Sequence, residues 1–131
     1  MKVPQIFDRN MKRLAFLDNA VSVGYSLEIN SLWTATFTLP ADDDKNAYCQ
    51  PLNFVDGDER IDLFRIIGED LERSNGATRF YDCEHVLAPL LSDVLFQYHQ
   101  YGGGGIKTAD VLNYVLARQT TRNWVLGDCD F

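Results

Sequence analysis

A glycine run is the first of several features whose residue types and spacing could carry chemistry. Residues 102–105 are all glycine and precede Lys107 and Thr108, an order similar to loops that bind nucleotide phosphates. A Walker A loop needs glycine directly before the lysine and again five residues before that glycine, but these positions hold Ile106 and Tyr101. Nor is the run a dinucleotide-binding fingerprint, which needs an intact parallel βαβ unit and a downstream acidic residue that binds the ribose. The run therefore predicts a flexible connector between a strand and a helix, and we assign no cofactor to it.

Two acidic clusters, residues 42–44 and 56–59, are candidates for binding a hard cation. Carboxylate oxygens are the ligands that Ca²⁺ and Mg²⁺ prefer. However, the spacing around Asp43 and Asp56 does not follow the calcium-loop pattern of alternating acidic residues, glycine and a closing glutamate. We interpret both clusters as solvated turns and expect no metal site.

Cys83, Glu84 and His85 place a thiol near an imidazole where a strand is expected to meet a helix. Cys83 and His85 share a side only if the strand continues through both. His99 is the only other histidine, so few bases are present to complete a nucleophilic site. We interpret this group as a buried thiol and a hydrogen-bonded imidazole, and expect no catalytic residues.

Aromatic residues form a further group with two open interpretations. Phe96, Tyr98 and Tyr101 alternate imperfectly with polar residues. They are typical either of a surface that stacks on sugars or faces another subunit, or of a hydrophobic core.

Composition limits the class of protein. The chain has 131 residues, a net charge of −7 and three cysteines without a C-x-x-C pair. The acidity argues against specific nucleic-acid binding, because such binding depends on clustered lysine and arginine. No apolar run is long enough to insert across a membrane, and the first residues do not form a secretory signal. Reduced thiols in a cytoplasm-made chain are the simplest reading of the cysteines.

Hydrophobic alternation predicts an antiparallel hairpin from residues 21–29 and 33–39. Further strands are expected at 61–67, 69–73 and 78–84, with a turn at 74–77 containing Asn75 and Gly76, which both tolerate positive φ. A small β-barrel over residues 1–85 would leave the fewest open edges.

A second subdomain is expected over residues 86–131. Its predicted elements are a helix at 86–91 with Pro89 in its first turn, a strand at 94–101, a helix from an N-cap at Thr108 to about Arg118, and a strand at 124–127. This α+β subdomain looks incomplete, which suggests a piece cut from a longer protein.

Several phrases, read in order, resemble a known family. They are "PQIFDRN", a strand pair ending in "TATFTLP", "LFRIIGEDLERSNGATRFYDCEHV", and "TADVLNYVLARQTTRNWVLGDCDF". Together they resemble the N-terminal tail-hub region of the phage minor structural proteins, also described as prophage tail endopeptidases or tail-associated lysins. The acidic loops around Asp43 and Asp56 and the four glycines depart from that pattern.

The resemblance implies a structural role in a virion. It implies a β-barrel of the tail-hub type, a homotrimeric baseplate hub, docking to the distal tail protein, and downstream fibre or lysin domains, in a tail assembled in the bacterial cytoplasm. Lytic chemistry in that family lies downstream, so no catalytic residue is carried onto this chain. The alternative hypothesis is a carbohydrate-binding β module that contacts cell-wall glycan through Trp33, Tyr98 and Tyr101; peptidase or glycosidase activity ranks third.

Overall fold

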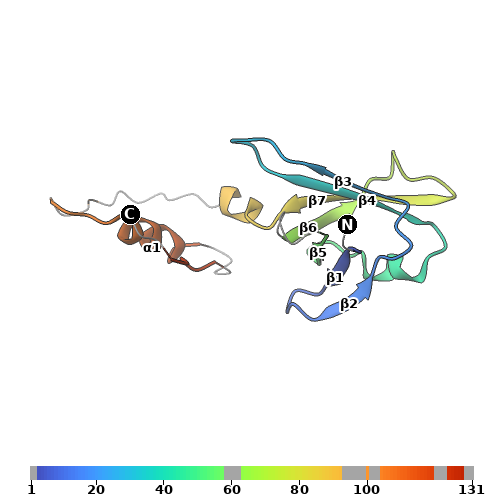
Figure 1. Ribbon diagram of the computed structural model, residues 1–131, viewed down its shortest axis with the longest axis horizontal. Helices are drawn as coiled ribbons and strands as arrows, with labels where there is room; N and C mark the ends of the chain where they lie inside the picture. Colours follow the sequence, from blue (N-terminus) through green and yellow to red (C-terminus); the bar gives the residue numbers. More distant parts are fainter. Residues whose placement is uncertain (1–2, 58–62, 93–99, 101–103, 120–123, 129–131) are drawn as a thin grey trace. The chain divides into compact units, whose positions relative to one another are not determined.

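The computed structural model describes residues 3–57, 63–92, 100, 104–119 and 124–128. By its backbone contacts the chain divides into two compact units, Met1–Val86 and Leu87–Phe131. All of the described strands lie in the first unit, and the described α-helix, α1 (Thr108–Leu116), lies in the second (Figure 1). An α+β class in which antiparallel β structure predominates is therefore confirmed.

Seven strands form one antiparallel sheet in the first unit. In chain order they are β1 (Gln5–Phe7), β2 (Arg13–Phe16), β3 (Ser22–Ser26), β4 (Thr34–Pro40), β5 (Phe54–Asp56), β6 (Leu63–Glu69) and β7 (Thr78–His85). Their order across the sheet is β2-β1-β5-β6-β7-β4-β3, and each neighbouring pair is antiparallel. Within the described residues β2 and β3 each pair on one side only, so the expected closed barrel is wrong and the sheet is open.

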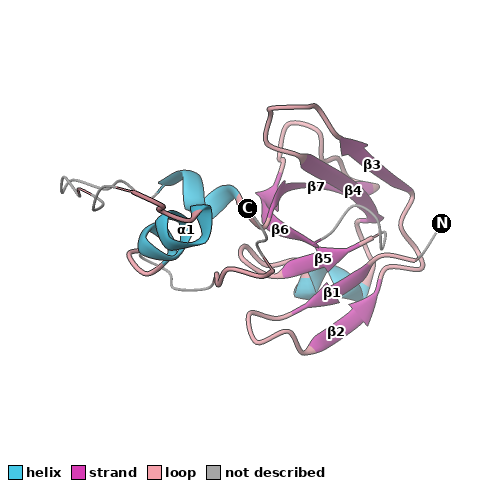
Figure 2. Ribbon diagram, turned by 60° about the vertical axis from the view of Figure 1, so that its left-hand side comes forward, coloured by secondary structure: helices cyan, strands magenta, loops and turns pink. Residues whose placement is uncertain are grey.

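The sheet is nevertheless strongly curled. Strands lie about 4.8 Å apart, so a flat sheet would separate β2 from β3 by roughly 29 Å. The chain passes from the end of β2 to the start of β3 through residues 17–21 alone, which span at most about 21 Å. The two edges must therefore approach each other, and Figure 2 shows the strands wrapped around a common interior.

Strand alternation supplies the core inside this curl. The buried side chains come from alternate positions on the strands and from the loops that close the ends: Ile6, Leu17, Ala35, Phe37, Leu39, Cys49, Val55, Phe64, Ile66, Tyr81 and Cys83. Phe37 and Tyr81 are cross-strand partners whose rings stack with centroids 5.0 Å apart. Such aromatic pairs stabilise a sheet beyond the area they bury, and this pair joins the neighbouring strands β4 and β7.

The predicted hairpin over residues 21–29 and 33–39 is confirmed as β3 and β4, paired from Ser22 with Thr38 to Ser26 with Thr34. Its apolar row is only partly covered, however. Val23 and Tyr25 pack against the core, whereas Val21, Leu27 and Ile29 are exposed. They lie beyond the two ends of the strand, where no layer of described residues covers them.

The connection between β6 and β7 differs from the prediction in two ways. The strand expected at 69–73 is wrong beyond Glu69, because the Asp70 side chain accepts the backbone N–H groups of Glu72 and Arg73 and folds them into a turn. Asn75 lies in the predicted turn, but neither it nor Gly76 has positive φ. Instead the Asn75 Oδ1 accepts the backbone N–H groups of Ala77 and Thr78. These side-chain hydrogen bonds hold the turn in place of the expected tight turn.

The second unit contains less regular structure than expected. The helix predicted at 86–91 is a short 3₁₀ helix, η2 (Ala88–Ser92). The strand predicted at 124–127 is wrong, because these residues are irregular and the Trp124 N–H donates to the Gln119 side chain. The strand predicted at 94–101 falls almost entirely outside the described residues.

Adding a side chain at Gly57 tests how tightly the interior of the curled sheet is packed. A Cβ added to Gly57 would lie 1.9 Å from the Tyr25 Oη, and the Tyr25 ring is held against Phe64 with centroids 5.8 Å apart. We predict that Gly57→Ala lowers the free energy of unfolding by about 1–3 kcal/mol, because the ring has little room to move. Urea denaturation measures this change.

Gly68→Ala is the matched control, because a Cβ at Gly68 would meet nothing within 4 Å. It should change stability by less than about 0.5 kcal/mol. The cost of Gly57→Ala should shrink in a Tyr25→Phe background, which removes the clashing oxygen. An equal cost with and without that oxygen would contradict this packing.

Candidate functional site

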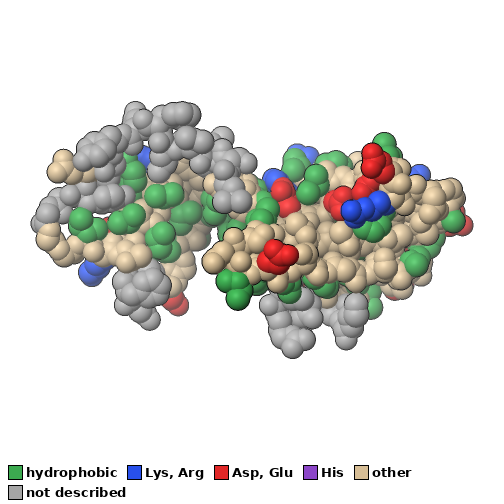
Figure 3. Space-filling model, turned by 90° about the horizontal axis from the view of Figure 1, so that it is seen from above, with side chains coloured by type: hydrophobic (Ala, Val, Ile, Leu, Met, Phe, Trp, Pro, Cys, Tyr) green, Lys and Arg blue, Asp and Glu red, His purple; other side chains and the backbone are tan. Residues whose placement is uncertain are grey.

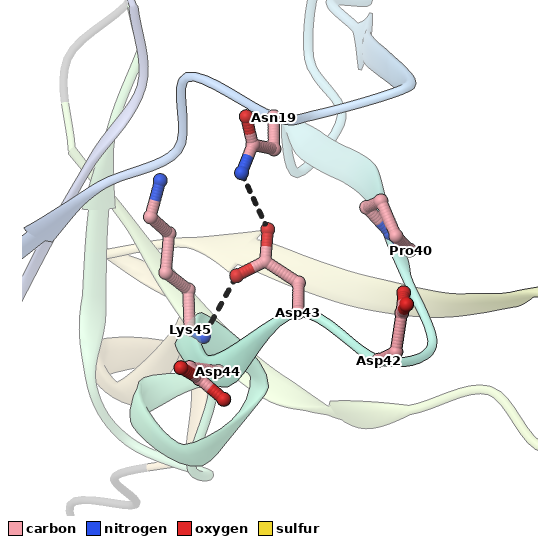
Figure 4. Close-up of a pocket in the computed structure, with 6 residues that line it drawn as sticks. All are labelled: Asn19, Pro40, Asp42, Asp43, Asp44 and Lys45. Atoms are coloured by element: carbon pink, nitrogen blue, oxygen red, sulfur yellow. Dashed lines mark hydrogen bonds between the residues drawn. The ribbon is translucent and has the colours of Figure 1, made fainter.

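An acidic depression lies where β4 is followed by the 3₁₀ helix η1 (Asp44–Tyr48). Its volume is about 440 Å³, and it is lined by Asn19, Pro40, Asp42, Asp43, Asp44 and Lys45 (Figure 4). Pro40 ends β4, and Asp43 begins η1 as its N-cap. The first acidic cluster of the sequence therefore forms the rim of a surface hollow.

Asp43 is committed to the fold. Its Oδ1 accepts the Lys45 N–H at 2.9 Å, and its Oδ2 accepts the Asn19 side chain at 3.1 Å. The Lys45 ammonium pairs with Asp18. These bonds tie the β2–β3 connection to η1, so the depression is built around a structural contact, with the exposed carboxylates of Asp42 and Asp44 at its margin.

The expected absence of a metal site was a prediction from spacing alone. Within the residues that the structure describes, no three His, Cys, Asp or Glu side chains lie close enough together to hold a metal ion. Asp56 lies on β5 rather than at this depression, and positions 58 and 59 of the second acidic cluster lie outside the described residues.

Asn46 holds the floor of the depression in place. Its Nδ2 donates to the backbone carbonyls of Pro40 at 2.8 Å, Ala41 at 3.3 Å and Asp43 at 2.8 Å. Its Oδ1 accepts the Tyr81 hydroxyl at 2.9 Å. One side chain therefore fixes the β4–η1 turn and anchors that turn to β7; sequence patterns gave no signal for it, because its partners are backbone carbonyls.

Tyr81 and Cys49, which lie next to Asn46, are both protonated at neutral pH. Burial raises the pKa of Tyr81 to about 12, and the adjacent Cys49 adds to the rise. Burial also raises the pKa of the Cys49 thiol to about 12, opposed by its hydrogen bond with Tyr81. At neutral pH both groups stay neutral and act as structural donors.

Cys83 and His85 do share one face of the sheet, because β7 continues to His85. Both are buried, and burial raises the pKa of the Cys83 thiol well above its usual range. A thiol that resists ionisation is a poor nucleophile. Cys83 therefore belongs to the core cluster, as its structural interpretation proposed.

The His85 ring occupies an aromatic enclosure. Trp33 and Phe64 both meet it edge-on, each with centroids 5.6 Å from the imidazole. Glu84 points to the opposite face of the sheet and pairs with its cross-strand partner Arg65 on β6. The three consecutive residues that suggested a reactive group are thus divided between the core and an outer ion pair.

Gly104 and Gly105, the described part of the glycine run, precede α1. Gly104 and Gly105 are exposed with φ of 92° and 72°, a conformation that favours glycine, while residues 101–103 lie outside the described part. The N-cap expected at Thr108 is wrong: Lys107 is the extended N-cap residue, and Thr108 is already helical. The helix ends at Leu116, and Arg118 beyond it donates to the Tyr114 carbonyl at 3.0 Å.

None of the helices in the described ranges is long and apolar enough to cross a membrane. Comparisons of the chain with protein-family models, with curated proteins and with solved structures find no match.

Asn46→Ala tests the anchoring of the depression. Loss of the amide leaves the Tyr81 hydroxyl without its acceptor and takes one donor from each of three carbonyls, of which those of Pro40 and Asp43 keep a backbone donor. We therefore predict a loss of about 2–4 kcal/mol in the free energy of unfolding. Asn19→Ala, which removes one exposed bond, is the control and should cost less than about 1 kcal/mol. Equal losses in chemical denaturation would show that Asn46 does not anchor the turn.

Thiol labelling tests the burial of Cys49. A pKa of about 12 in place of 9.0 lowers the thiolate fraction at pH 8 by about 1,000-fold. Alkylation of Cys49 in the folded chain, mapped by peptide mass, should therefore be at least about 1,000-fold slower than in urea. Labelling of the folded chain at the denatured rate would contradict this environment.

Proposed function

We propose that this chain is a structural component of a bacteriophage or prophage tail tip. In this proposal it is the N-terminal part of a baseplate hub protein that assembles as a homotrimer, docks to the distal tail ring and carries downstream fibre or lysin domains. The described residues have an architectural role and no catalytic one, in a virion tail assembled in the bacterial cytoplasm.

The observation that carries the proposal is where the resembling phrases lie in the fold. The early Ile-Phe-Asp phrase lies on and directly after β1, the Leu-Pro pair ends β4, the Phe-Arg-Ile phrase lies on β6, and the Tyr-Asp-Cys-Glu-His phrase lies on β7. Phrases spread over eighty residues thus belong to one sheet. A resemblance that follows the strands of a single structural unit supports a shared architecture more strongly than the same letters in loops.

Exposed apolar side chains support an assembly role. Val21, Leu27 and Ile29 are 64%, 45% and 94% exposed at one edge of the sheet. Val21 precedes β3, and Leu27 and Ile29 follow it. Exposed apolar groups along a sheet edge are suited to burial in a protein–protein contact. The acidic character of the chain agrees with a protein that DNA passes without binding.

The carbohydrate-binding alternative gains no support from Trp33. Its ring meets His85 edge-on, and its Nε1–H donates to the Glu28 carbonyl at 3.2 Å. These contacts hold the β3–β4 hairpin in shape, so the indole is used in packing. Tyr98 and Tyr101 lie outside the described residues.

Light scattering and a binding assay test the proposal together. The purified chain, with a mass of 14.9 kDa, should form an assembly whose number of copies is a multiple of three and should co-migrate with a distal tail ring protein. A chain that neither forms threefold assemblies nor binds the ring would contradict the hub. Release of soluble fragments from purified cell wall by this chain would contradict the non-enzymatic role.

A further inference from the structure

The β3 edge of the sheet carries few of the features that normally protect an edge strand. Natural edges are blunted by charged residues, proline, bulges or short length, because an open edge can pair with another chain. The eight residues 20–27, which contain β3, include no charged residue and no proline. The described structure places β4 on one side of β3 and no strand on the other (Figure 2).

The opposite edge is protected by comparison. β2 is shorter, its first residue is the exposed Arg13, and Lys12 precedes it. Its pairing with β1 also contains an irregularity between Ile6 and Phe7. Because β3 lacks such charges, the two edges differ in their readiness to accept another strand.

Apolar side chains at both ends of β3 are exposed to solvent. Val23 and Tyr25 pack against the core, but Val21 before the strand and Leu27 after it remain 64% and 45% exposed. Seen from above the view of Figure 1, hydrophobic side chains reach the surface at several places, interspersed with acidic and basic ones (Figure 3). An uncharged strand whose apolar row extends beyond its own core is suited to strand addition.

We propose that the β3 edge binds the β3 edge of a second copy of this chain, antiparallel and centred on Gly24, so that one sheet continues across a twofold axis. The sequence of the strand is complementary to itself in this register. Val21 then lies opposite the partner's Leu27, and Val23 opposite the partner's Tyr25. On the other face Ser22 lies opposite the partner's Ser26, and the two Gly24 residues face each other.

This register covers Val21 and Leu27, two of the apolar side chains that the single chain leaves exposed. Each exposed Val21 meets an exposed Leu27, and cross-strand pairs of an aromatic with a β-branched residue, such as Tyr25 with Val23, are favourable. No like charges are opposed, because the segment carries none. Twofold contacts of this self-complementary kind are also the commonest way in which identical chains associate.

The inference does not depend on the proposed function, since a twofold contact is separate from the closure of a threefold ring. A hub trimer whose threefold axis meets this twofold axis at a right angle would contain six copies. A chain without threefold closure would be a dimer. In both cases, loss of the β3 contact halves the mass of the assembly.

Two variants that add charges to β3 test the register. Ser22 and Ser26 are exposed, and the one side-chain hydrogen bond lost, from the Ser22 hydroxyl to Thr38 Oγ1 at 3.0 Å, is lost equally in both variants. Ser22→Lys/Ser26→Lys should therefore leave the fold intact while placing lysine opposite lysine twice across the contact. We expect its mass by light scattering to be half that of the unchanged chain. Ser22→Lys/Ser26→Glu carries the same number of new charges but opposes lysine with glutamate, so it should keep the full mass.

An unchanged mass for Ser22→Lys/Ser26→Lys, or a halved mass for both variants, would overturn the register. Circular dichroism checks that each variant is folded. A different protein as the true occupant of the edge would also leave the mass of the purified chain unchanged, and so counts against the proposal.

Disulfide trapping provides a second test that does not depend on tolerating new charges. Directly opposed residues of antiparallel strands have Cα atoms about 4.5–5.5 Å apart, within disulfide range. A mixture of Ser22→Cys chains with Ser26→Cys chains should therefore give a disulfide-linked pair on oxidation. Each variant alone places its new thiols about 13 Å apart and should give none beyond the background of the unchanged chain. Equal linking in all samples, or none in the mixture, would overturn the proposal.

Discussion

The fold depends on the shortness of the connection between β2 and β3. These strands are the two edges of a seven-stranded sheet, yet only residues 17–21 join them. A chain of that length cannot span a flat sheet of this width. The curl that results turns the inner faces of all the strands toward one another, so a single open sheet encloses its own core without a second layer.

The same connection between β2 and β3 forms one side of the acidic depression. Leu17 is buried in the core, and its N–H donates to the Pro4 carbonyl at 2.7 Å, which directs the chain across the end of the sheet. Asp18 and Asn19 then reach Lys45 and Asp43 on η1. The cluster of carboxylates that resembles a ligand site is therefore a by-product of closing one end of the curl, with Asn46 and the neutral Tyr81 beneath it.

Curling without closing leaves an edge at β3. A closed barrel would have paired β3 with β2 and buried its backbone groups, whereas the described sheet leaves β3 with β4 alone. Tyr25 fills the interior beside Gly57, but the apolar row continues to Val21 and Leu27 past the covered region. An incomplete closure thus converts part of a core-forming strand into an interaction surface.

The sequence by itself determined the elements whose signal is local. Alternation predicted β3 and β4 because each has enough residues to show a period of two, and it placed Phe37 and Leu39 on the same face. β1, β2 and β5 have only three or four residues, too few for a period to be visible. The roles of Asn46 and His85, and the choice of an open curl over a barrel, were decided only by the tertiary structure. They depend on contacts between residues far apart in the chain, and local patterns carry no information on which distant groups will meet.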